Sequence, residues 1–380
     1  MQREKFGSRL GFLLLSAGCA IGIGNVWRFP YVVGQNGGGL FVLLYVFFLA
    51  VVGIPVLTME FAIGRASRKS CIKAYQELEP KGSKWHWHGI FAMLGNYVLM
   101  AFYTTVAGWM LYYFYRFLIG EMSGLDKAGI DNAFSGMLGQ PVTMTIWMLI
   151  IVVLGFVICS FGLQKGVERI TKWMMVALLV IMVVLAVNSL FLPGASEGIR
   201  FYLVPDLSKV QETGILGTIT AAMNQSFFTL SLGIGAMLIF GSYLGRERRL
   251  LGESINIAIL DTFVAFVSGL IIFPACFAYD VPVDSGPPLI FMTLPNVFNS
   301  MAAGRVWGTL FFLFMSFASF STIVAVFENI LACTIDLSGW SRKKAALVNG
   351  IIVAIISMPC ILGYNVWSGS VPFEAGTAVL

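Results

Sequence analysis

The stretch SAGCAIGIGNVWRFP, residues 16–30, lies inside the first apolar segment and contains several residues that weaken a helix. Glycine lowers helix stability by about 1 kcal/mol relative to alanine, and proline costs about 3 kcal/mol in a helix interior. Every backbone polar group in hydrocarbon also needs a partner. A membrane-length segment interrupted in this way is therefore expected to use its free backbone groups for binding. The interrupting residues are Gly18, Gly22, Gly24, Asn25, Arg28 and Pro30.

The composition indicates a polytopic helical membrane protein. The 380 residues are 58% hydrophobic and only 11% charged, with a mean hydropathy of +0.85. Soluble domains of this length do not have such a composition, and long uncharged runs recur along the whole chain. The first apolar run is not a cleavable signal peptide, because it lacks a small-residue cleavage site and carries polar residues where such a peptide is apolar. The six scattered cysteines, with no C-x-x-C pair, are interpreted as small apolar residues.

We expect nine helical membrane spans, which makes the fold class all-α. If the N-terminus is cytoplasmic, 18 of the 24 Lys and Arg residues fall on the cytoplasmic side, as the positive-inside rule requires. The net charge of +5 then reflects membrane topology and gives no indication of nucleic-acid binding. Residues 283–300 are expected to form a short re-entrant or interfacial helix. The nine spans cover about residues 8–33, 38–63, 89–117, 141–162, 168–192, 214–244, 254–279, 304–336 and 344–364.

A second interrupted span repeats the pattern of the first. Residues 232–235 (LGIG) resemble residues 21–24 (IGIG), and each group falls in the middle of its apolar segment. Matched glycine-interrupted segments are typical of inverted-repeat transporters, although glycines also serve close helix packing. Unwound turns offer carbonyls to hard cations, and half-helix N-termini offer N–H groups to anions. The oxygen-bearing candidates within the spans are Asn25, Thr229, Ser231, Asp261, Ser321 and Thr322.

Asp261 is the acidic residue that stands out among these candidates. It lies in an apolar run with no basic residue within a helical turn. A charge there costs about a few kcal/mol. The carboxyl group therefore needs a nearby cation or must be protonated. The alternative is an acid that caps a helix or faces a loop.

Four long motifs resemble the neurotransmitter:sodium symporter family, and the resemblance covers nearly the whole chain. It is closest to the short bacterial members that take up several hydrophobic amino acids. It implies the LeuT-like fold, in which two inverted repeats pack together and spans one and six are unwound at their middle. The motifs are GNVWRFPYVVGQNGGGLF (24–41), GIPVLTMEFAIGR (53–65), QSFFTLSLGIGAM (225–237) and FASFSTIVAVFENI (317–330).

The resemblance implies two bound and transported sodium ions and no organic cofactor. The first ion site would consist of the Ala20 carbonyl, Asn25, Thr229, Asp261 and the carboxylate of the substrate. The second would consist of the Gly18 and Ile21 carbonyls with Ala318, Ser321 and Thr322. The last three residues depend on the alignment of span eight, which could shift by one residue. The implied substrate-binding residues are Ala20, Gly22, Gly24, Leu99, Tyr103, Phe228, Thr229, Ser231, Ile234 and Val326.

Within this set the resemblance gives some residues separate roles. The Tyr103 hydroxyl would donate to the substrate carboxylate, and Phe228 would cover the site from outside, although both could equally be ordinary aromatic packing. The side chains of Leu99, Ser231, Ile234 and Val326 would select the substrate side chain, and three of them are apolar. A hydrophobic pocket discriminates one methylene by only about 1–3 kcal/mol, so broad selectivity for hydrophobic amino acids is expected.

Two positions bear on the substrate and on chloride. Gly22 stands where the family's biogenic-amine carriers have an aspartate, which favours a substrate that brings its own carboxylate. Asp261 stands where chloride-dependent members have an asparagine, and Ala265 stands where they have a serine. A fixed carboxylate supplies the charge that chloride otherwise brings, so transport without chloride is expected.

The resemblance also implies gates. Arg28 would be the basic half of an outer gate, and Arg3 with Asp336 would form the inner pair near Tyr243, with Phe6 in place of the usual tryptophan. Asp336 could equally be a solvated acid at a helix end. Glu60 is expected to accept from backbone N–H groups of the unwound span six, and Glu328 has no role assigned from the sequence.

The chain is expected to be a single transporter domain, residues 1–380, with a first repeat at about 8–192 and a second at about 214–364. The fold requires five spans in each repeat and this chain supplies five plus four. We expect a truncated chain, and the alternatives are a partner that supplies the missing tenth span or an inactive protein. Symport by alternating access would move spans one, two, six and seven against spans three, four, eight and nine. The chain is expected to cross the cell membrane several times and to contact lipid. Whether it forms a homo-oligomer stays an open question.

The sequence disfavours two other classes of function and leaves a third open. A membrane enzyme is disfavoured because no H-E-x-x-H or G-x-S-x-G motif occurs, and His86 and His88 lie in a loop. A channel is disfavoured because no charged ring or repeated filter appears. A non-transporting scaffold or sensor, or an inactive truncated fragment, with the same fold is the main alternative, and it would not require Asn25, Thr229 and Asp261 together.

Overall fold

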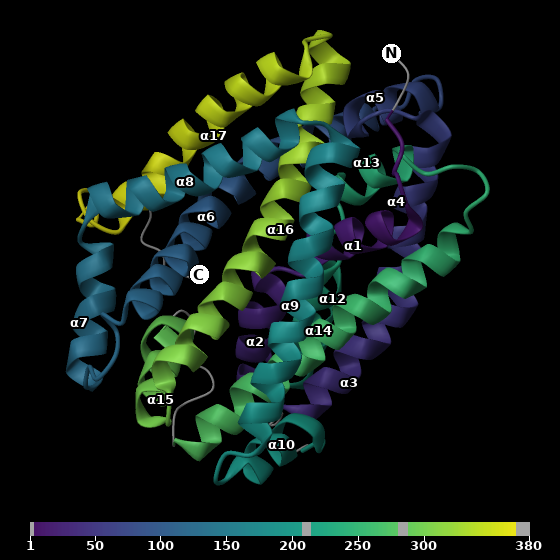
Figure 1. Ribbon diagram of the computed structural model, residues 1–380. Helices are drawn as coiled ribbons and strands as arrows, with labels where there is room; N and C mark the ends of the chain where they lie inside the picture. Colours follow the sequence, from purple (N-terminus) through teal and green to yellow (C-terminus); the bar gives the residue numbers. More distant parts are fainter. Residues whose placement is uncertain (1–3, 207–213, 280–287, 370–380) are drawn as a thin grey trace.

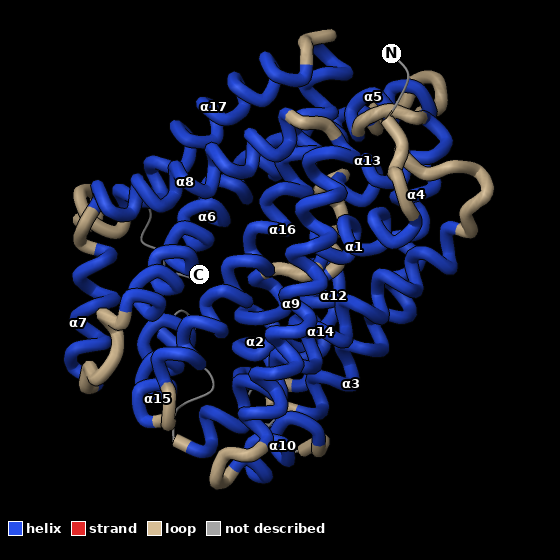
Figure 2. Tube along the Cα trace, in the orientation of Figure 1, coloured by secondary structure: helices blue, strands red, loops and turns tan. Residues whose placement is uncertain are grey.

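The computed structural model describes residues 4–206, 214–279 and 288–369. Its helices form one bundle in which α1 lies near the middle, packed against α16, α9 and α14 (Figure 1). Loop segments lie mostly at the two ends of the bundle, but they also occur inside it, at the breaks of two helices (Figure 2). These internal breaks position the candidate site.

The helical elements follow the expected spans. The first part of the chain contains α1 (Arg9–Ala20), η1 (Gly24–Arg28), α2 (Phe29–Gln35), α3 (Gly39–Phe48), η2 (Leu49–Gly53), α4 (Ile54–Ser67), α5 (Cys71–Leu78), α6 (His86–Ile119), α7 (Lys127–Leu138), α8 (Pro141–Ser160), η3 (Leu163–Glu168) and α9 (Arg169–Leu190). The second part contains α10 (Ala195–Leu203), α12 (Ile215–Thr229), α13 (Ala236–Ser242), α14 (Leu250–Ala278), η4 (Leu289–Thr293), α15 (Leu294–Ser300), α16 (Gly304–Ser338) and α17 (Arg342–Gly363). The η elements are single π-helical turns.

The two spans that the sequence marks as interrupted are broken in the structure. Among the described residues, seven continuous helical stretches are long and apolar enough to cross a membrane, and Arg9–Ala20 with Gly24–Gln35 forms an eighth that bends by 52°. The expected sixth span consists of α12 and α13, which have 15 and 7 residues and are separated by residues 230–235. Neither half has the roughly 20 residues that a single span needs, so the two halves must serve together as one span.

Several connecting segments are more structured than the sequence indicates. The short helices α5, α7 and α10 lie in segments expected to be loops. Residues 288–300 form the expected short helix, as η4 and α15, and its side chains Leu289, Ile290 and Phe291 are fully buried. The beginning of that segment, residues 283–287, lies outside the described residues, as do Arg3 and the last eleven residues.

Small residues let α4 and α13 approach closely. A Cβ atom at Gly64 would lie 1.8 Å from the carbonyl oxygen of Leu238, and one at Gly241 would lie 2.6 Å from that of Phe61. Close backbone approach of this kind drives helix association in membranes, where lipid is as apolar as the side chains. The contact fixes α13 against α4 and thereby brings Glu60 to the break in span six.

Candidate ion and substrate site

The break in the first span frees carbonyl groups near the middle of the bundle. α1 ends at Ala20, and Ile21 has an extended ψ of 97°. Helical bonding resumes at η1, a π-helical turn that leads directly into α2, whose second residue is Pro30. The carbonyls of Gly18 and Cys19 therefore accept from side chains of other helices instead of from their own helix.

Five oxygen atoms converge beside this break, and they belong to two helices. The Ser321 hydroxyl lies 3.1 Å from the carbonyl oxygen of Gly18, 3.5 Å from that of Ile21 and 3.0 Å from that of Ala318. The Thr322 hydroxyl lies 3.1, 3.3 and 3.4 Å from the same three oxygens. Two hydroxyl protons cannot satisfy three carbonyls that each carry two lone pairs. The oxygen-rich cluster is thus a set of ligands suited to a hard cation.

A second polar cluster surrounds Asp261, whose side chain is fully buried. Its carboxylate accepts from the Asn25 amide at 2.8 Å and from the Thr229 hydroxyl at 2.8 Å, with the Tyr45 hydroxyl at 3.5 Å. The Asn25 amide nitrogen also lies 3.2 Å from the Asp261 backbone oxygen. These partners from η1, α12 and α3 are all neutral, so within the described residues no cation compensates a charge on the carboxylate. The structure thereby brings together the three side chains that the sequence singled out on separate spans.

A cavity of about 430 Å³ lies between the two breaks. Most of the predicted substrate-binding residues line it, namely Ala20, Gly24, Leu99, Tyr103, Phe228, Ser231 and Ile234. The sequence analysis did not anticipate Cys19, Asn224, Phe227 and Leu232 in the lining, and it placed Arg28 and Thr322 only at the gate and the ion site. The wall is mainly apolar, as a pocket for an aliphatic or aromatic side chain requires.

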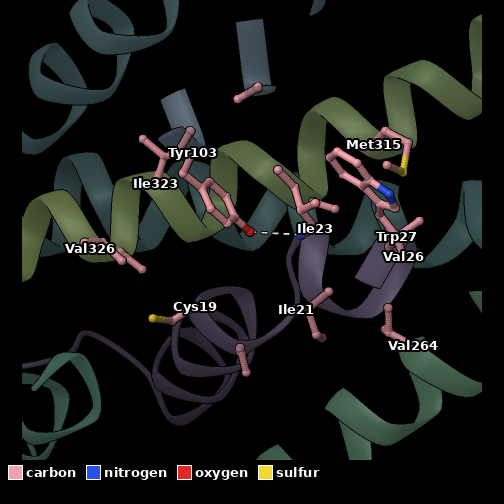
Figure 3. Packing of buried hydrophobic residues seen from close by; sticks show 14 of the residues in the cluster. Cys19, Ile21, Ile23, Val26, Trp27, Tyr103, Val264, Met315, Ile323 and Val326 are labelled. Carbon is pink, nitrogen blue, oxygen red and sulfur yellow. Dashed lines mark hydrogen bonds between the residues drawn. The ribbon is translucent and has the colours of Figure 1, made fainter. Parts of the chain in front are cut away.

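Three predicted substrate-binding residues do not line this cavity. Thr229 faces Asp261, and Gly22 packs against Tyr103 and Thr322. Val326 is fully buried one helical turn beyond Thr322, among the packed apolar side chains (Figure 3). Residues four apart on a helix share a face, so Val326 lies on the face of Thr322, but unlike Thr322 it does not line the cavity.

The Tyr103 hydroxyl reaches the unwound segment of the first span. It accepts a hydrogen bond of 2.8 Å from the backbone N–H of Ile23, and Figure 3 shows the ring pointing from α6 towards this segment. A Cβ atom at Gly22 would lie 2.2 Å from the Tyr103 hydroxyl and 2.5 Å from that of Thr322. The glycine is therefore required for the close approach of α6 and α16 to the first break.

The break in span six depends on residues in the left-handed region. Ser231 has a φ of +52°, and Gly233 and Gly235 have φ values of +85° and +77°. The strained Ser231 is held by its hydroxyl, which donates to the Cys19 carbonyl at 3.1 Å and so ties the two breaks together. Glu60 accepts from the Gly233 N–H at 2.6 Å, which confirms the contact expected for it.

Two asparagines that the sequence analysis missed fix a carbonyl of this break. Asn96 on α6 and Asn329 on α16 both donate to the Ile234 carbonyl oxygen, at 2.7 and 3.1 Å. Both side chains are fully buried. Their signal in the sequence is a polar amide inside a membrane span, a feature that usually marks function. They hold in place the backbone of a residue that lines the cavity.

Arg28 and Phe228 line one end of the cavity. The Arg28 guanidinium lies 4.5 Å from the centre of the Phe228 ring and donates to the side-chain oxygen of Gln225. Gln225 in turn donates to the Gly24 carbonyl at 3.3 Å. Gln225 is a further residue that the sequence analysis missed, and it connects α12 to the first broken span.

At the opposite end of the bundle the structure assigns partners to Glu328. Its buried carboxylate accepts from the Tyr243 hydroxyl at 2.8 Å and forms an ion pair with Arg342, which also binds Glu4 at 3.0 Å. Phe6 packs edge-on against Tyr243, with 5.7 Å between the ring centres. The cluster joins α13, α16, α17 and the N-terminal segment.

Asp336 accepts from the backbone N–H of Ser70 at 2.7 Å, next to the start of α5. Its expected gate partner Arg3 lies outside the described residues. The pairing of these two residues therefore stays a prediction.

The fold and these clusters define a class of protein: a sodium-dependent membrane transporter built on two broken helices. The chain matches the family described as the sodium:neurotransmitter symporter family over residues 3–125 and 130–370. It belongs to this family, whose members are transporters and not enzymes.

Individual relatives are similar over almost the whole chain. The "uncharacterized sodium-dependent transporter YhdH" of Bacillus subtilis is 34% identical over 364 residues, which are 96% of this chain and 80% of that protein. A sodium-dependent transporter of Haemophilus influenzae is 32% identical over 377 residues, 96% of this chain and 81% of that protein. The crystal structure of MhsT in complex with L-phenylalanine superimposes with a TM-score of 0.91 at 36% identity, and the match covers all of this chain and 85% of that one.

Proposed function

We propose that this chain is a symporter that couples the movement of sodium to the uptake of hydrophobic L-amino acids, without a requirement for chloride. The observation that carries the proposal is a mainly apolar cavity at the first break, next to which two clusters of oxygen atoms also converge. Both clusters use backbone or side-chain groups of the first break. The similarity to MhsT, which was crystallised with L-phenylalanine, supports the substrate class.

The Asp261 cluster would bind the first sodium ion. Its ligands would be the Ala20 carbonyl, the side-chain oxygens of Asn25 and Thr229, the Asp261 carboxylate and the carboxylate of the bound amino acid. The Asn25 side-chain oxygen lies 3.3 Å from the Gly22 N–H, which orients the amide with this oxygen towards the break. Because the substrate supplies one ligand, the affinities for ion and substrate would rise together, and this is the basis of coupling.

The five-oxygen cluster would bind the second sodium ion. Gly18, Ile21 and Ala318 would contribute carbonyls, and Ser321 and Thr322 would contribute hydroxyls. The ion would tie α16 to the broken first span, so its release would free that span to move. Five oxygen ligands fit a hard monovalent cation, by comparison with the six to eight oxygens that calcium takes.

The amino acid would lie in the cavity with its carboxylate near Tyr103 and the first ion. The half-helix N-terminus at the first break would direct N–H groups at this carboxylate. Leu99 and Ile234 would contact the side chain, and Asp261, already charged, would make chloride unnecessary. Arg28 and Phe228 would close the outer end, and the Tyr243–Glu328–Arg342 cluster would close the inner end.

We further propose that the chain lies in the cell membrane with a cytoplasmic N-terminus, as its Lys and Arg distribution favours. The first repeat would comprise residues 8–192 and the second residues 214–364. Alternating access would move the broken spans and their neighbours, spans two and seven, against spans three, four, eight and nine.

Binding of a radiolabelled amino acid to the purified chain tests the proposal. We expect saturable binding of leucine or phenylalanine in sodium chloride and in sodium gluconate, and none in choline chloride. Equal binding in sodium and choline would favour a scaffold or sensor that uses the fold without ion coupling. Binding that disappears in gluconate at constant sodium would contradict chloride independence while leaving the sodium site intact.

Removal of the hydroxyls of the second cluster is expected to weaken sodium binding. In Ser321→Ala or Thr322→Val the sodium concentration for half-maximal amino-acid binding should rise about tenfold, since one lost polar ligand costs on the order of 1–3 kcal/mol. Ser319→Ala is the matched control. The Ser319 hydroxyl is equally buried on α16 but bonds only to the Ser316 carbonyl, at 3.1 Å, and this variant should bind sodium normally. An unchanged sodium requirement in both site variants would exclude this cluster as an ion site.

A further inference from the structure

The structure contains a second, separate groove on the membrane-facing side of the bundle. It has a volume of about 420 Å³ and runs between α8 and α17, which lie side by side in Figure 1. The exposed side chains of Leu149, Val153 and Val157 form one wall, and those of Leu347 and Ile351 form the other. The groove shares no residue with the cavity described above.

The floor of the groove is a buried aromatic ring that is packed on a neighbouring helix. Phe156 is buried there and stacks on Phe327 of α16, with 3.9 Å between ring centres and 15° between ring planes. Gly350 of α17 faces this floor, and a Cβ atom there would only touch the Phe156 ring, at 3.4 Å. The missing side chain at Gly350 therefore deepens the groove, and the hollow exists before any ligand enters.

One end of the groove is polar and basic. Lys343 and Ser160 line it at that end, and no aspartate or glutamate lines it anywhere along the described helices. The neighbouring basic residues are engaged elsewhere. Arg342 pairs with Glu4 and Glu328, and the Lys344 ammonium lies 4.4 Å from the centre of the Trp340 ring. Lys343 has no ion pair within the parts of the chain that the structure describes.

The length of the groove matches one leaflet of a bilayer. It extends along α8 from Leu149 to Ser160, which corresponds to about 17 Å at about 1.5 Å per residue. Half of the hydrocarbon core, which is about 30 Å thick, is about 15 Å. An acyl chain inserted along the groove would therefore reach the middle of the membrane while its headgroup lay at Lys343.

We propose that this groove is a binding site for an anionic phospholipid. Its acyl chain occupies the apolar groove over Phe156 and Gly350, and its phosphate group binds Lys343. The Ser160 hydroxyl lines the same polar end of the groove. The leaflet is the one on the side of Glu4, because Arg342 joins Glu4 to the start of α17. The site depends only on the membrane location of the chain, so its test is independent of the proposed substrate.

Lipid titration of the purified chain in detergent tests the site. Thermal unfolding midpoints are measured with increasing dioleoylphosphatidylglycerol or dioleoylphosphatidylcholine. We expect the anionic lipid to stabilise the chain at lower concentration than the neutral lipid. Lys343→Ala should weaken phosphatidylglycerol binding about fivefold, since one basic residue near an anionic lipid surface contributes about 1 kcal/mol, and it should weaken phosphatidylcholine binding less, because the choline ammonium of that lipid offsets the charge of its phosphate.

Lys344→Ala is the matched control, with the same change of charge one residue away and outside the groove. Gly350→Leu fills the groove without a change of charge and should weaken binding of both lipids, and Ala354→Leu does the same at the far end if the first variant is unstable. Equal losses in the two lysine variants would show a nonspecific effect of surface charge and overturn the proposal. Equal stabilisation by the two lipids, or a Gly350→Leu variant that changes oligomeric state instead of lipid binding, would overturn it as well.

Discussion

Replacing Asp261 by asparagine is expected to abolish sodium-dependent amino-acid binding. The carboxylate is fully buried, and its described partners Asn25, Thr229 and Tyr45 are neutral, so a bound cation would be its only countercharge. Removing one partner of a buried ion pair costs about 3–5 kcal/mol, which lowers affinity by at least about a hundredfold. The asparagine has nearly the same shape, so the loss would reflect the charge. The measurement is binding of radiolabelled leucine against sodium concentration.

A matched control separates this effect from a general loss of fold. Glu197→Gln makes the same acid-to-amide exchange at an exposed position in the first turn of α10, and it should bind leucine normally. Thermal unfolding of both variants without ligand establishes that they are folded. If Asp261→Asn keeps the sodium dependence of the parent chain, the first ion site cannot include this carboxylate, and the proposed coupling through the substrate carboxylate fails with it.

The sequence predicts the two broken spans well, because the local helix preferences of their residues oppose a continuous membrane helix. Glycines and a proline inside an apolar run conflict with a continuous membrane helix, and both segments with this conflict are broken in the structure. The sequence singles out Asn25, Thr229 and Asp261 as candidate site residues because a polar side chain inside an apolar span is costly and usually marks function. Their meeting at 2.8 Å follows from the fold, which the family motifs implied.

The residues that the sequence did not reveal act through the packing of distant helices. Asn96 and Asn329 bind the same Ile234 carbonyl from α6 and α16, and nothing in either local sequence indicates a shared partner. The end of the cavity before Val326 likewise depends on how Tyr103 and Thr322 fill the space between their helices. Helix periodicity specifies a face, but the depth of a cavity depends on the side chains of the opposing helix.

Glu328 shows the same limitation in a charged residue. The sequence places it in a span without an evident partner, whereas the structure pairs it with Arg342, at the start of the next helix, and with Tyr243 of the broken span six. A buried carboxylate with one cation and one hydroxyl donor is compensated and needs no bound ion. This distinguishes Glu328 from Asp261, which has only neutral described partners and stands beside the cavity.

Substitution of Gly22 by alanine is expected to impair binding of both the amino acid and sodium. The added Cβ would lie 2.2 Å from the Tyr103 hydroxyl and 2.5 Å from the Thr322 hydroxyl. Neither group can easily retreat, because Tyr103 is bound to the Ile23 N–H and Thr322 belongs to the five-oxygen cluster. Overpacking of this kind costs about 1–3 kcal/mol, so affinity should fall between about fivefold and a hundredfold. Leucine binding at fixed sodium, and sodium dependence at fixed leucine, measure the two effects.

A second glycine calibrates the result. Gly95→Ala on α6 has no neighbouring atom within 4 Å of the added Cβ and should bind as the parent does. A Gly22→Ala variant as active as Gly95→Ala would show that Tyr103 and Thr322 do not approach the break in the binding state. The same distances restrict what an aspartate at position 22 could do. Its Cβ would displace the Tyr103 hydroxyl, which we propose binds the carboxylate of the amino acid. An aspartate here would supply a countercharge for an amine, but on this proposal the pocket would no longer fit an amino acid.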